Sequence, residues 1–450
     1  MNTRIHLKYK QSGIYIFMGL TLSACILFLQ VGFTYYWSFQ ILALLLLMIV
    51  ILKNRPLLVN LAPILLSTAI FATFLLLVTL NAPLAISQDT DVFTFIGVIG
   101  YAIMIISAPN IAFRSPVNIL LFFRFVSAAT LISIASLICI ADLSIIPFFN
   151  REILIYQNIT LIDNFTTLDV LAKDFFMRDT LGLEPDMDLF YGEQSFLAVV
   201  IFACVTSNII SDKLLRAISP PMHELGREAL QDKSFADANF NLQSFLLVVA
   251  LATMLYIKSF STFFYVLVIC ISIFLGASNR RFYINFTIGK VLIFSLAVIL
   301  LGGIIVQSVF DYYSHRLSTL SDSISFEQRF ASIFDFGFQE YIFGIIDTAK
   351  IPQYGFHNGI LYIIGISGLG GIGLIIFLYY RIYLLARPFR LSFLAIMCAF
   401  GIFSQNGGVF SPSKIVLLWL VLIPLSCVNR FRLPKHTIEV EVEQKNGNGY

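Results

Sequence analysis

The chain contains a succession of apolar runs, most of them long enough to cross a lipid bilayer, joined mainly by short polar turns. A membrane-spanning helix needs about 20 mostly apolar residues, because hydrocarbon offers the backbone no hydrogen-bond partners. Charged residues make up only 12% of the chain, whereas soluble domains contain about 25%. The sequence therefore predicts an all-α, polytopic transmembrane protein with about 12 spans. These lie near residues 13–31, 35–52, 57–80, 91–109, 117–141, 193–210, 242–257, 260–277, 283–309, 357–380, 391–410 and 413–428.

Two features of the predicted spans allow more than one structure: a closely spaced pair of runs and a charged residue inside a span. The runs 242–257 and 260–277 are either a tight hairpin around Lys258 or one broken long element. Arg124 lies about seven residues inside its predicted span. A charge at that depth either extends toward the nearer membrane surface or faces a partner or a cavity.

The distribution of Lys and Arg predicts the orientation. With both termini in the cytoplasm, 19 of the 29 basic residues fall on the inner side and 7 on the outer side. Cytoplasmic loops carry an excess of Lys and Arg in membrane proteins. The inverted orientation would break this bias at nearly every short loop, so we expect the N-in, C-in arrangement.

The chain is predicted to form a single transmembrane domain over residues 1–428, followed by a disordered cytoplasmic tail over 429–450. Three connections are long: outer loops near 142–192 and 310–356, and a cytoplasmic loop near 211–241. The cytoplasmic loop mixes charges without an apolar face, which is typical of a solvated connector. Loops of this length are usually functional or disordered, so we expect function in the two outer loops.

The second outer loop contains a pattern for a short interfacial helix. Ser325 and Gln328 fit a capping box at a helix start. One apolar stripe follows at helical spacing, and Arg329 lies on its edge. The stripe consists of Phe326, Phe330, Ile333, Phe334 and Tyr341. Such a helix would hold a guanidinium at the level of the lipid headgroups.

Several classes of function lack support in the sequence. No GxxxxGK[ST] motif is present, so ATP-driven transport is not indicated. No HExxH motif or carboxylate pair at metal-ligand spacing occurs. The six cysteines all lie in apolar runs without paired spacing, so neither disulfides nor a thiolate metal site is implied. We expect no metal and no cofactor.

A stretch of roughly 55 residues, Arg316 to Gly371, carries a family resemblance. It contains the segments E-Q-R-F-A-S-I-F-D-F-G-F-Q-E-Y-I-F-G and H-N-G-I-L-Y-I-I-G-I-S-G-L-G-G. This order resembles the O-antigen polymerase and O-antigen ligase superfamily, in which an Arg-bearing helix in the last large periplasmic loop precedes a His-Asn pair that opens a Gly-rich span. The matching positions are Arg329, Gly344, His357, Asn358, Gly365, Gly368 and Gly371.

A second segment, upstream, also resembles this superfamily. Glu193, Gln194 and Ser195 are similar to the E-P-S-x-x-A segment that opens a span in many polysaccharide polymerases. Gln194 stands where that segment has Pro, which affects the local backbone more than the carboxylate of Glu193.

The resemblance implies a membrane glycosyltransferase of the bacterial cytoplasmic (inner) membrane that acts at the periplasmic face. Its donor would be an oligosaccharide linked to undecaprenyl diphosphate, and no nucleic acid would be involved. A polymerase transfers the growing glycan onto another lipid-linked repeat unit, together with a chain-length regulator protein as a potential partner. A ligase transfers the finished glycan onto lipid A core. The Glu193 segment favours the polymerase, whereas the His357-Asn358 pair is common to both.

Transfer from a diphosphate requires charge neutralisation on the leaving group. Arg suits this role because its planar fork is always charged and grips two phosphate oxygens. The outer-loop candidates are Arg329 first, then Arg178 and Arg316. The alternative for each is an interfacial arginine that only anchors its segment in the headgroup layer.

The acceptor hydroxyl requires a base. His357 is the first candidate because imidazole is neutral near pH 7, and the residue opens a span beside Asn358 and a run of glycines. Asn358 would orient the acceptor. Glu193 is the second candidate base, against the alternative of a carboxylate that only complements a helix N-terminus.

A different class of function stays open at this level. Lipid-linked glycan flippases and other transporters also have about twelve spans. Their folds commonly show two comparable halves and polar residues near the middle of the membrane. Here the loop lengths of the two halves differ and the spans contain almost no Asp or Glu. The enzyme is therefore the favoured hypothesis.

Overall fold

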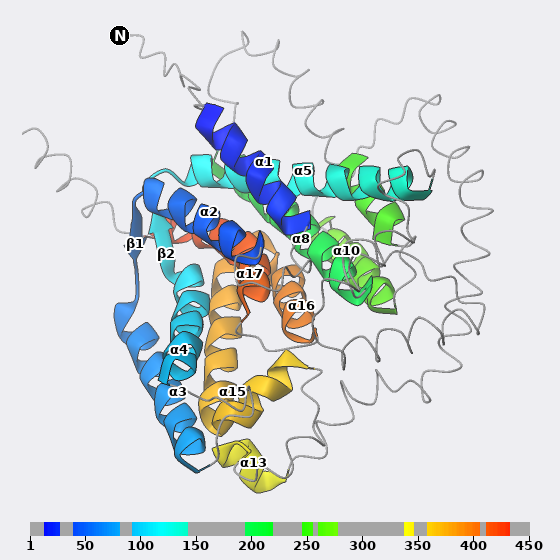
Figure 1. Cartoon of the computed structure of the whole chain (residues 1–450). Helices are drawn as coiled ribbons and strands as arrows, with labels where there is room; N and C mark the ends of the chain where they lie inside the picture. Colours follow the sequence, from blue (N-terminus) through cyan, green and yellow to red (C-terminus); the bar gives the residue numbers. More distant parts are fainter. Residues whose placement is uncertain are drawn as a thin grey trace, which may run out of the picture.

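The three-dimensional structure, a computed structural model of the chain, describes residues 13–27, 39–81, 92–142, 194–218, 245–254, 260–277, 337–345, 358–405 and 411–432. Within these ranges the chain is mostly helical (Figure 1). The helices are α1 (Gly13–Leu27), α2 (Phe39–Lys53), α3 (Leu61–Asn81), α4 (Val92–Ser107), α5 (Pro116–Asp142), α8 (Gln194–Ile218), α10 (Phe260–Ala277), α13 (Phe338–Phe343), α15 (Gly359–Ala386), α16 (Ser392–Phe403), α17 (Pro412–Ser426) and α18 (Asn429–Arg432), with 3-10 turns η1 (Ala108–Asn110) and η7 (Arg387–Phe389). A further apolar helix spans Phe245–Met254.

The predicted apolar runs are helical over most of the length that the structure describes. Each run contains a helix except 283–309, which lies outside the described residues. Four helical segments are long and apolar enough to cross a bilayer: Leu61–Val78, Pro116–Ser136, Phe196–Ile218 and Gly359–Phe389. The protein is therefore a helical chain with several bilayer-compatible helices.

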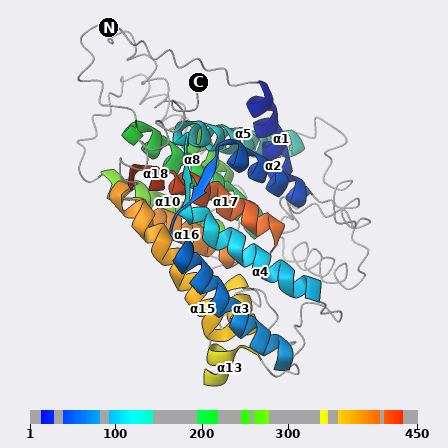
Figure 2. The ribbon, with the colours of Figure 1, turned by 90° about the vertical axis from the view of Figure 1, so that its left-hand side faces the viewer.

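The candidate spans do not all run in one direction. α3 and α15 lie side by side along much of their length, and both views show this (Figures 1 and 2). α5 runs across their direction at the other end of the molecule (Figure 1). The total number of spans and their orientation therefore stay predictions.

The centre and the edge of the fold differ in burial. α8 packs against α5, α10, α16 and α17, and 89% of its bilayer-compatible window is buried. Only 22% of the corresponding window of α3 is buried, and Leu65 and Leu66 on that helix are exposed. A face of exposed leucines is costly in water and favourable in hydrocarbon. α3 is therefore suited to face lipid, whereas α8 is a core helix.

The all-α prediction misses one small sheet. Strand β1 (Pro56–Leu58) pairs antiparallel with β2 (Ile111–Phe113), with Leu57 opposite Ala112. The Asn429 amide donates to the carbonyls of Pro109, at 3.0 Å, and Ile111, at 2.9 Å. The turn between α2 and α3, the turn between α4 and α5 and the chain after α17 are thus joined. Three-residue strands carry too little periodicity to be recognised in a sequence.

Two predicted boundaries need correction. The helix expected to end at residue 210 continues to Ile218, so the first residues of the predicted loop 211–241 are helical. Gly337 is extended, with φ −71° and ψ 163°, and it caps the separate helix α13. Tyr341 therefore does not belong to one continuous helix with Phe334. The rest of the capping-box helix and the loop 142–192 lie outside the described residues.

Candidate functional site

Of the predicted site residues, the structure describes Asn358. The side chain of Asn358 is 1% exposed and caps the N-terminus of α15. Its Oδ1 accepts a hydrogen bond from the Ile360 backbone N–H at 2.8 Å. Asn is among the strongest N-cap residues because its short side chain reaches an amide that has no partner within the helix. The cap fixes the start of α15 next to His357 in the sequence.

The other predicted site residues lie outside the described residues. These are His357, Arg329, Glu193, Arg178 and Arg316. His357 directly precedes Asn358, and Glu193 directly precedes Gln194, the first residue of α8. The structure therefore bears on these residues through the elements that follow them in the chain.

α15 is broken at Gly368, in the middle of its glycine-rich half. Gly368 has φ 46° and ψ −127°, a conformation open to glycine and strained for other residues. A break in a helix leaves backbone groups near it without their partner one turn away. Here the Gly365 carbonyl accepts a hydrogen bond from the Ile345 backbone N–H at 2.7 Å. The segment after α13 thus takes the place of the missing helical turn.

Glycines make this close approach possible on both sides. Gly344 ends α13 with φ 83°, and a Cβ on it would lie 2.6 Å from the Gly365 carbonyl oxygen. A Cβ on Gly368 would overlap the Ile342 carbonyl oxygen. We call this contact the glycine junction: Ile342, Gly344, Ile345, Gly365 and Gly368.

α3 is the third element at this end of α15. A Cβ on Gly370 would lie 2.8 Å from the Phe74 Cβ and 3.2 Å from the Phe71 Cα. Val78, near the end of α3, lies against Gly344. α13 and α3 therefore both pack close to the backbone of the glycine-rich half of α15. Figure 1 shows this region at the bottom of the molecule.

α13 presents polar groups next to the junction. The Glu340 carboxylate lies over the Gly337 backbone at the start of α13. Partial burial raises the pKa of Tyr341, so its phenol is a neutral hydrogen-bonding group at pH 7. Both residues lie within the motif that carries the family resemblance. Glu340 is not among the site residues predicted from the sequence.

A buried lysine was also missed by sequence reasoning. Lys414 is 2% exposed, and its Nζ donates to the Gln405 carbonyl oxygen at 2.8 Å. The Gln405 amide donates to the Tyr265 hydroxyl at 3.2 Å, and the Tyr265 ring stacks on Phe202. This polar chain joins α10, α16 and α17. A charge at the start of an apolar run is the sequence signal by which Lys414 could have been found.

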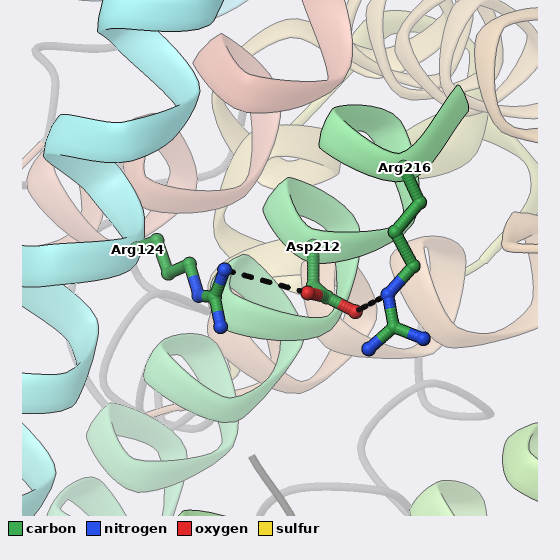
Figure 3. Close-up of polar contacts among 3 residues, drawn as sticks. All are labelled: Arg124, Asp212 and Arg216. Atoms are coloured by element: carbon green, nitrogen blue, oxygen red, sulfur yellow. Dashed lines mark ion pairs between the residues drawn. The ribbon is translucent and has the colours of Figure 1, made fainter. Parts of the chain in front are cut away.

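The predicted solvated connector begins with a buried ion pair. Asp212 is 7% exposed and lies between Arg124 of α5 and Arg216 of α8 (Figure 3). Arg124 therefore faces a charged partner, one of the two alternatives that its depth allowed. Asp212 is a paired residue of a helix interface and not part of a solvated loop.

No group of three or more His, Cys, Asp or Glu side chains that could hold a metal ion occurs within the described ranges. Compared with protein-family models, curated proteins and solved structures, the chain gave no match.

Proposed function

We propose that the protein is an O-antigen or surface polysaccharide polymerase, a multi-pass enzyme of the bacterial inner membrane with about twelve spans. It transfers a growing glycan from undecaprenyl diphosphate onto another lipid-linked repeat unit at the periplasmic face. The observation that carries this proposal is the glycine junction. Gly344, Gly365 and Gly368, three glycines of the motif, meet there through their backbones.

The junction supports the proposal because it ties together the two halves of the motif. The half with Arg329 leads into α13, and the half with His357 leads into α15. A backbone hydrogen bond between Ile345 and Gly365 limits how far these two halves separate. Catalysis by positioning needs rigid support for the groups that bind the substrate.

The proposed grouping of segments on the same side of the membrane is supported by three contacts, whereas the identity of the cytoplasmic side rests on the distribution of Lys and Arg. β1 pairs with β2, Arg124 pairs with Asp212, and Ile345 bonds to Gly365. Each contact joins two segments that the distribution of Lys and Arg assigns to the same side of the membrane. The first two lie on the proposed cytoplasmic side and the third on the periplasmic side.

In the proposed reaction, a hydroxyl oxygen of the acceptor sugar bonds to the anomeric carbon of the donor glycan. The bond between that carbon and the diphosphate oxygen breaks, and undecaprenyl diphosphate leaves. Arg329, with Arg178 and Arg316, stabilises the negative charge that develops on the diphosphate. His357 takes the hydroxyl proton, with Glu193 as the other candidate, and Asn358 orients the acceptor. The reaction consumes no cofactor and uses no metal.

The test is transfer by the purified protein with a synthetic lipid-linked oligosaccharide. We expect longer lipid-linked glycans, with one free undecaprenyl diphosphate released for each glycosidic bond formed, and activity unchanged by a chelator. In cells, loss of the gene should reduce a lipopolysaccharide ladder to core plus one unit. Bare core together with lipid-linked polymer would instead identify a ligase.

One observation favours a second candidate, a flippase or transporter for lipid-linked glycans. Transporters commonly build their substrate sites from broken helices, and α15 is broken at Gly368. In this chain the Gly365 carbonyl at the break accepts from Ile345, a protein group. Movement of the lipid-linked glycan across vesicles without formation of a glycosidic bond would establish the transporter.

A further inference from the structure

The strand β1 is exposed, although its partner β2 is buried. Leu57 and Leu58 of β1 are 54% and 50% exposed, and Leu61, at the start of α3, is 53% exposed. On β2, Ala112 is 2% exposed and Phe113 is 1% exposed. Figure 1 shows the two strands at the left edge of the molecule, above α3. β1 therefore presents apolar side chains to its surroundings.

Neither bulk water nor the hydrocarbon layer suits such a strand. Exposed leucines are costly in water. Within the described residues the sheet has two strands, so β1 has one open edge, and an open edge is costly in hydrocarbon because its backbone groups find no hydrogen-bond partner. β1 leads into the candidate span Leu61–Val78. The headgroup layer at the end of this span suits β1, because leucines reach the acyl chains there while the backbone stays hydrated.

Two arginines adjoin the same end of this pair of strands. Pro56 of β1 is paired with Phe113 of β2, so Arg55 and Arg114 are the next residues beyond that pair. Both arginines are exposed. Within the part of the chain that the structure describes, neither side chain forms an ion pair or a hydrogen bond. Two guanidinium groups therefore meet the solvent at one place without a counter-charge. We call residues 55–58 and 111–114 the surface ribbon.

The surface ribbon combines the two kinds of group that recognise an anionic phospholipid. A guanidinium donates two parallel hydrogen bonds to phosphate oxygens, and leucines next to it contact acyl chains. Free phosphate would satisfy the arginines but leave the leucines in water, whereas a lipid satisfies both. The distribution of Lys and Arg assigns these turns to the cytoplasmic side, whose leaflet carries anionic lipids.

We propose that the surface ribbon is a binding site for an anionic phospholipid at the membrane surface. Arg55 and Arg114 bind the phosphate of the headgroup, and Leu57, Leu58 and Leu61 contact the upper part of the acyl chains. The pairing of β1 with β2 holds the two arginines at one end of the ribbon, so that both serve the same headgroup. The site lies in the turns before α3 and α5, apart from the proposed catalytic residues.

The depth of β1 is measured with Leu57→Trp in the full chain, reconstituted into phosphatidylglycerol vesicles. The acyl chains carry bromine either near the headgroup or near the terminal methyl group, and bromine quenches indole fluorescence only over a short distance. The parent protein, with its two tryptophans, gives the background. We expect the additional fluorescence of the variant to be quenched more strongly by bromine near the headgroup. No quenching of it, or stronger quenching by bromine near the terminal methyl group, would overturn the proposal.

The second experiment measures lipid binding to the full chain in a neutral detergent. Thermal unfolding and native mass spectrometry are recorded with phosphatidylglycerol, with diacylglycerol of the same acyl chains, and with inorganic phosphate at constant ionic strength. We expect phosphatidylglycerol to raise the melting temperature in a saturable way, and the other two compounds to have no such effect. Equal stabilisation by diacylglycerol or by inorganic phosphate would overturn the proposal.

Variants separate this site from a general effect of charge. Arg55→Gln and Arg114→Gln should each weaken the apparent affinity for phosphatidylglycerol about fivefold, and the double variant about 25-fold, near the value of one and two basic residues at an anionic surface. Lysine at either position keeps the charge but loses the fork, so it should weaken binding less. Arg387→Gln, which removes an exposed arginine of η7, is the matched control and should leave the affinity unchanged.

Each shift is compared with the lipid-free melting temperature of the same variant, so that a lower baseline stability does not count as lost binding. Full phosphatidylglycerol binding by the Arg55→Gln, Arg114→Gln double variant would overturn the proposal. So would an equal loss of affinity in Arg387→Gln, because charge spread over the whole surface would then explain the binding. None of these measurements uses transferase activity, so the outcome is independent of the proposed function.

Discussion

The glycine junction and the Asp212 ion pairs both fasten one helix to another, the first through backbone atoms and the second through side chains. At the glycine junction the contact is made by backbone atoms, with Ile345 N–H bonded to the Gly365 carbonyl and no room for a Cβ on Gly344 or Gly368. At the Asp212 ion pairs the contact is made by the long side chains of Arg124 and Arg216, which meet at Asp212. A backbone contact is lost when a single methyl group is added, whereas an ionic contact changes stepwise with charge, salt and side-chain length.

The largest effect on stability is expected for Gly368→Ala. The substitution forces a left-handed conformation on alanine, which costs about 1–3 kcal/mol, and overlap with the Ile342 carbonyl adds a similar amount. Thermal and denaturant unfolding of the purified variant measure the loss.

Gly373→Ala is the matched control for this prediction. Gly373 lies on the same helix, and a Cβ there would meet nothing within 4 Å. Alanine is better than glycine in a helix by up to about 1 kcal/mol, so the control should be neutral or stabilised. Equal behaviour of the two variants would contradict the close backbone contact at Gly368.

Next in size is the effect of Arg329→Ala on transfer. Activity should fall about 10²–10³-fold, the scale for losing one electrostatic contact in a transition state. Expression and membrane insertion should be unchanged, and lysine should restore activity only in part because it lacks the bidentate fork. Near-normal transfer by Arg329→Ala would exclude the diphosphate role.

For the Asp212 ion pairs, Asp212→Asn should destabilise the protein by about 1–3 kcal/mol. Removing one partner of a fully buried ion pair costs about 3–5 kcal/mol, and the exposure of Arg216 reduces this. Asp212→Glu, which keeps the charge, should lose less. Melting temperatures at low and high salt provide the measurement; a variant as stable as the parent at low salt would show that the carboxylate does not fasten α5 to α8.

His357 should control the pH dependence of transfer. A base has to be deprotonated, so activity should fall as the pH drops through about 6.5, the ordinary pKa of histidine, by about tenfold for each pH unit below it. His357→Gln should lower activity and flatten this part of the profile. If the profile keeps its shape in the variant, the base is Glu193.

The smallest effect is expected for Asn358→Ala, which removes the cap of α15 and should cost about 0.5–2 kcal/mol. Asn358→Asp keeps an oxygen acceptor for the Ile360 N–H and should restore stability. The amide has a second role if the aspartate variant is stable but transfers poorly. Full transfer by a stable aspartate variant would limit Asn358 to capping.

Much of the local structure follows from the sequence by itself. Apolar runs of sufficient length predict helices because a helix satisfies its own backbone in hydrocarbon, and helices occupy most of the length of these runs that the structure describes. The sequence predicts a span that opens near residue 357, and α15 begins there, but the capping of this helix by Asn358 is known only from the structure. The predicted roles of Arg329, Arg178, Arg316, His357 and Glu193 stay predictions, because these residues lie outside the described ranges.

Only the tertiary structure decided what these helices contact. The motif by itself does not reveal that Gly368 breaks α15, because a glycine is also tolerated in a continuous helix. At the break, the Ile342 carbonyl lies against Gly368 and the Ile345 N–H bonds to the Gly365 carbonyl. Likewise, Asp212 lies in a segment whose mixed charges are typical of a solvated loop. Its burial depends on Arg124, 88 positions earlier in the chain. Local propensity acts over a few residues, whereas the satisfaction of a carbonyl or a charge depends on groups that folding brings from far away. The sequence therefore determined the helices, and packing determined which polar groups among them are paired.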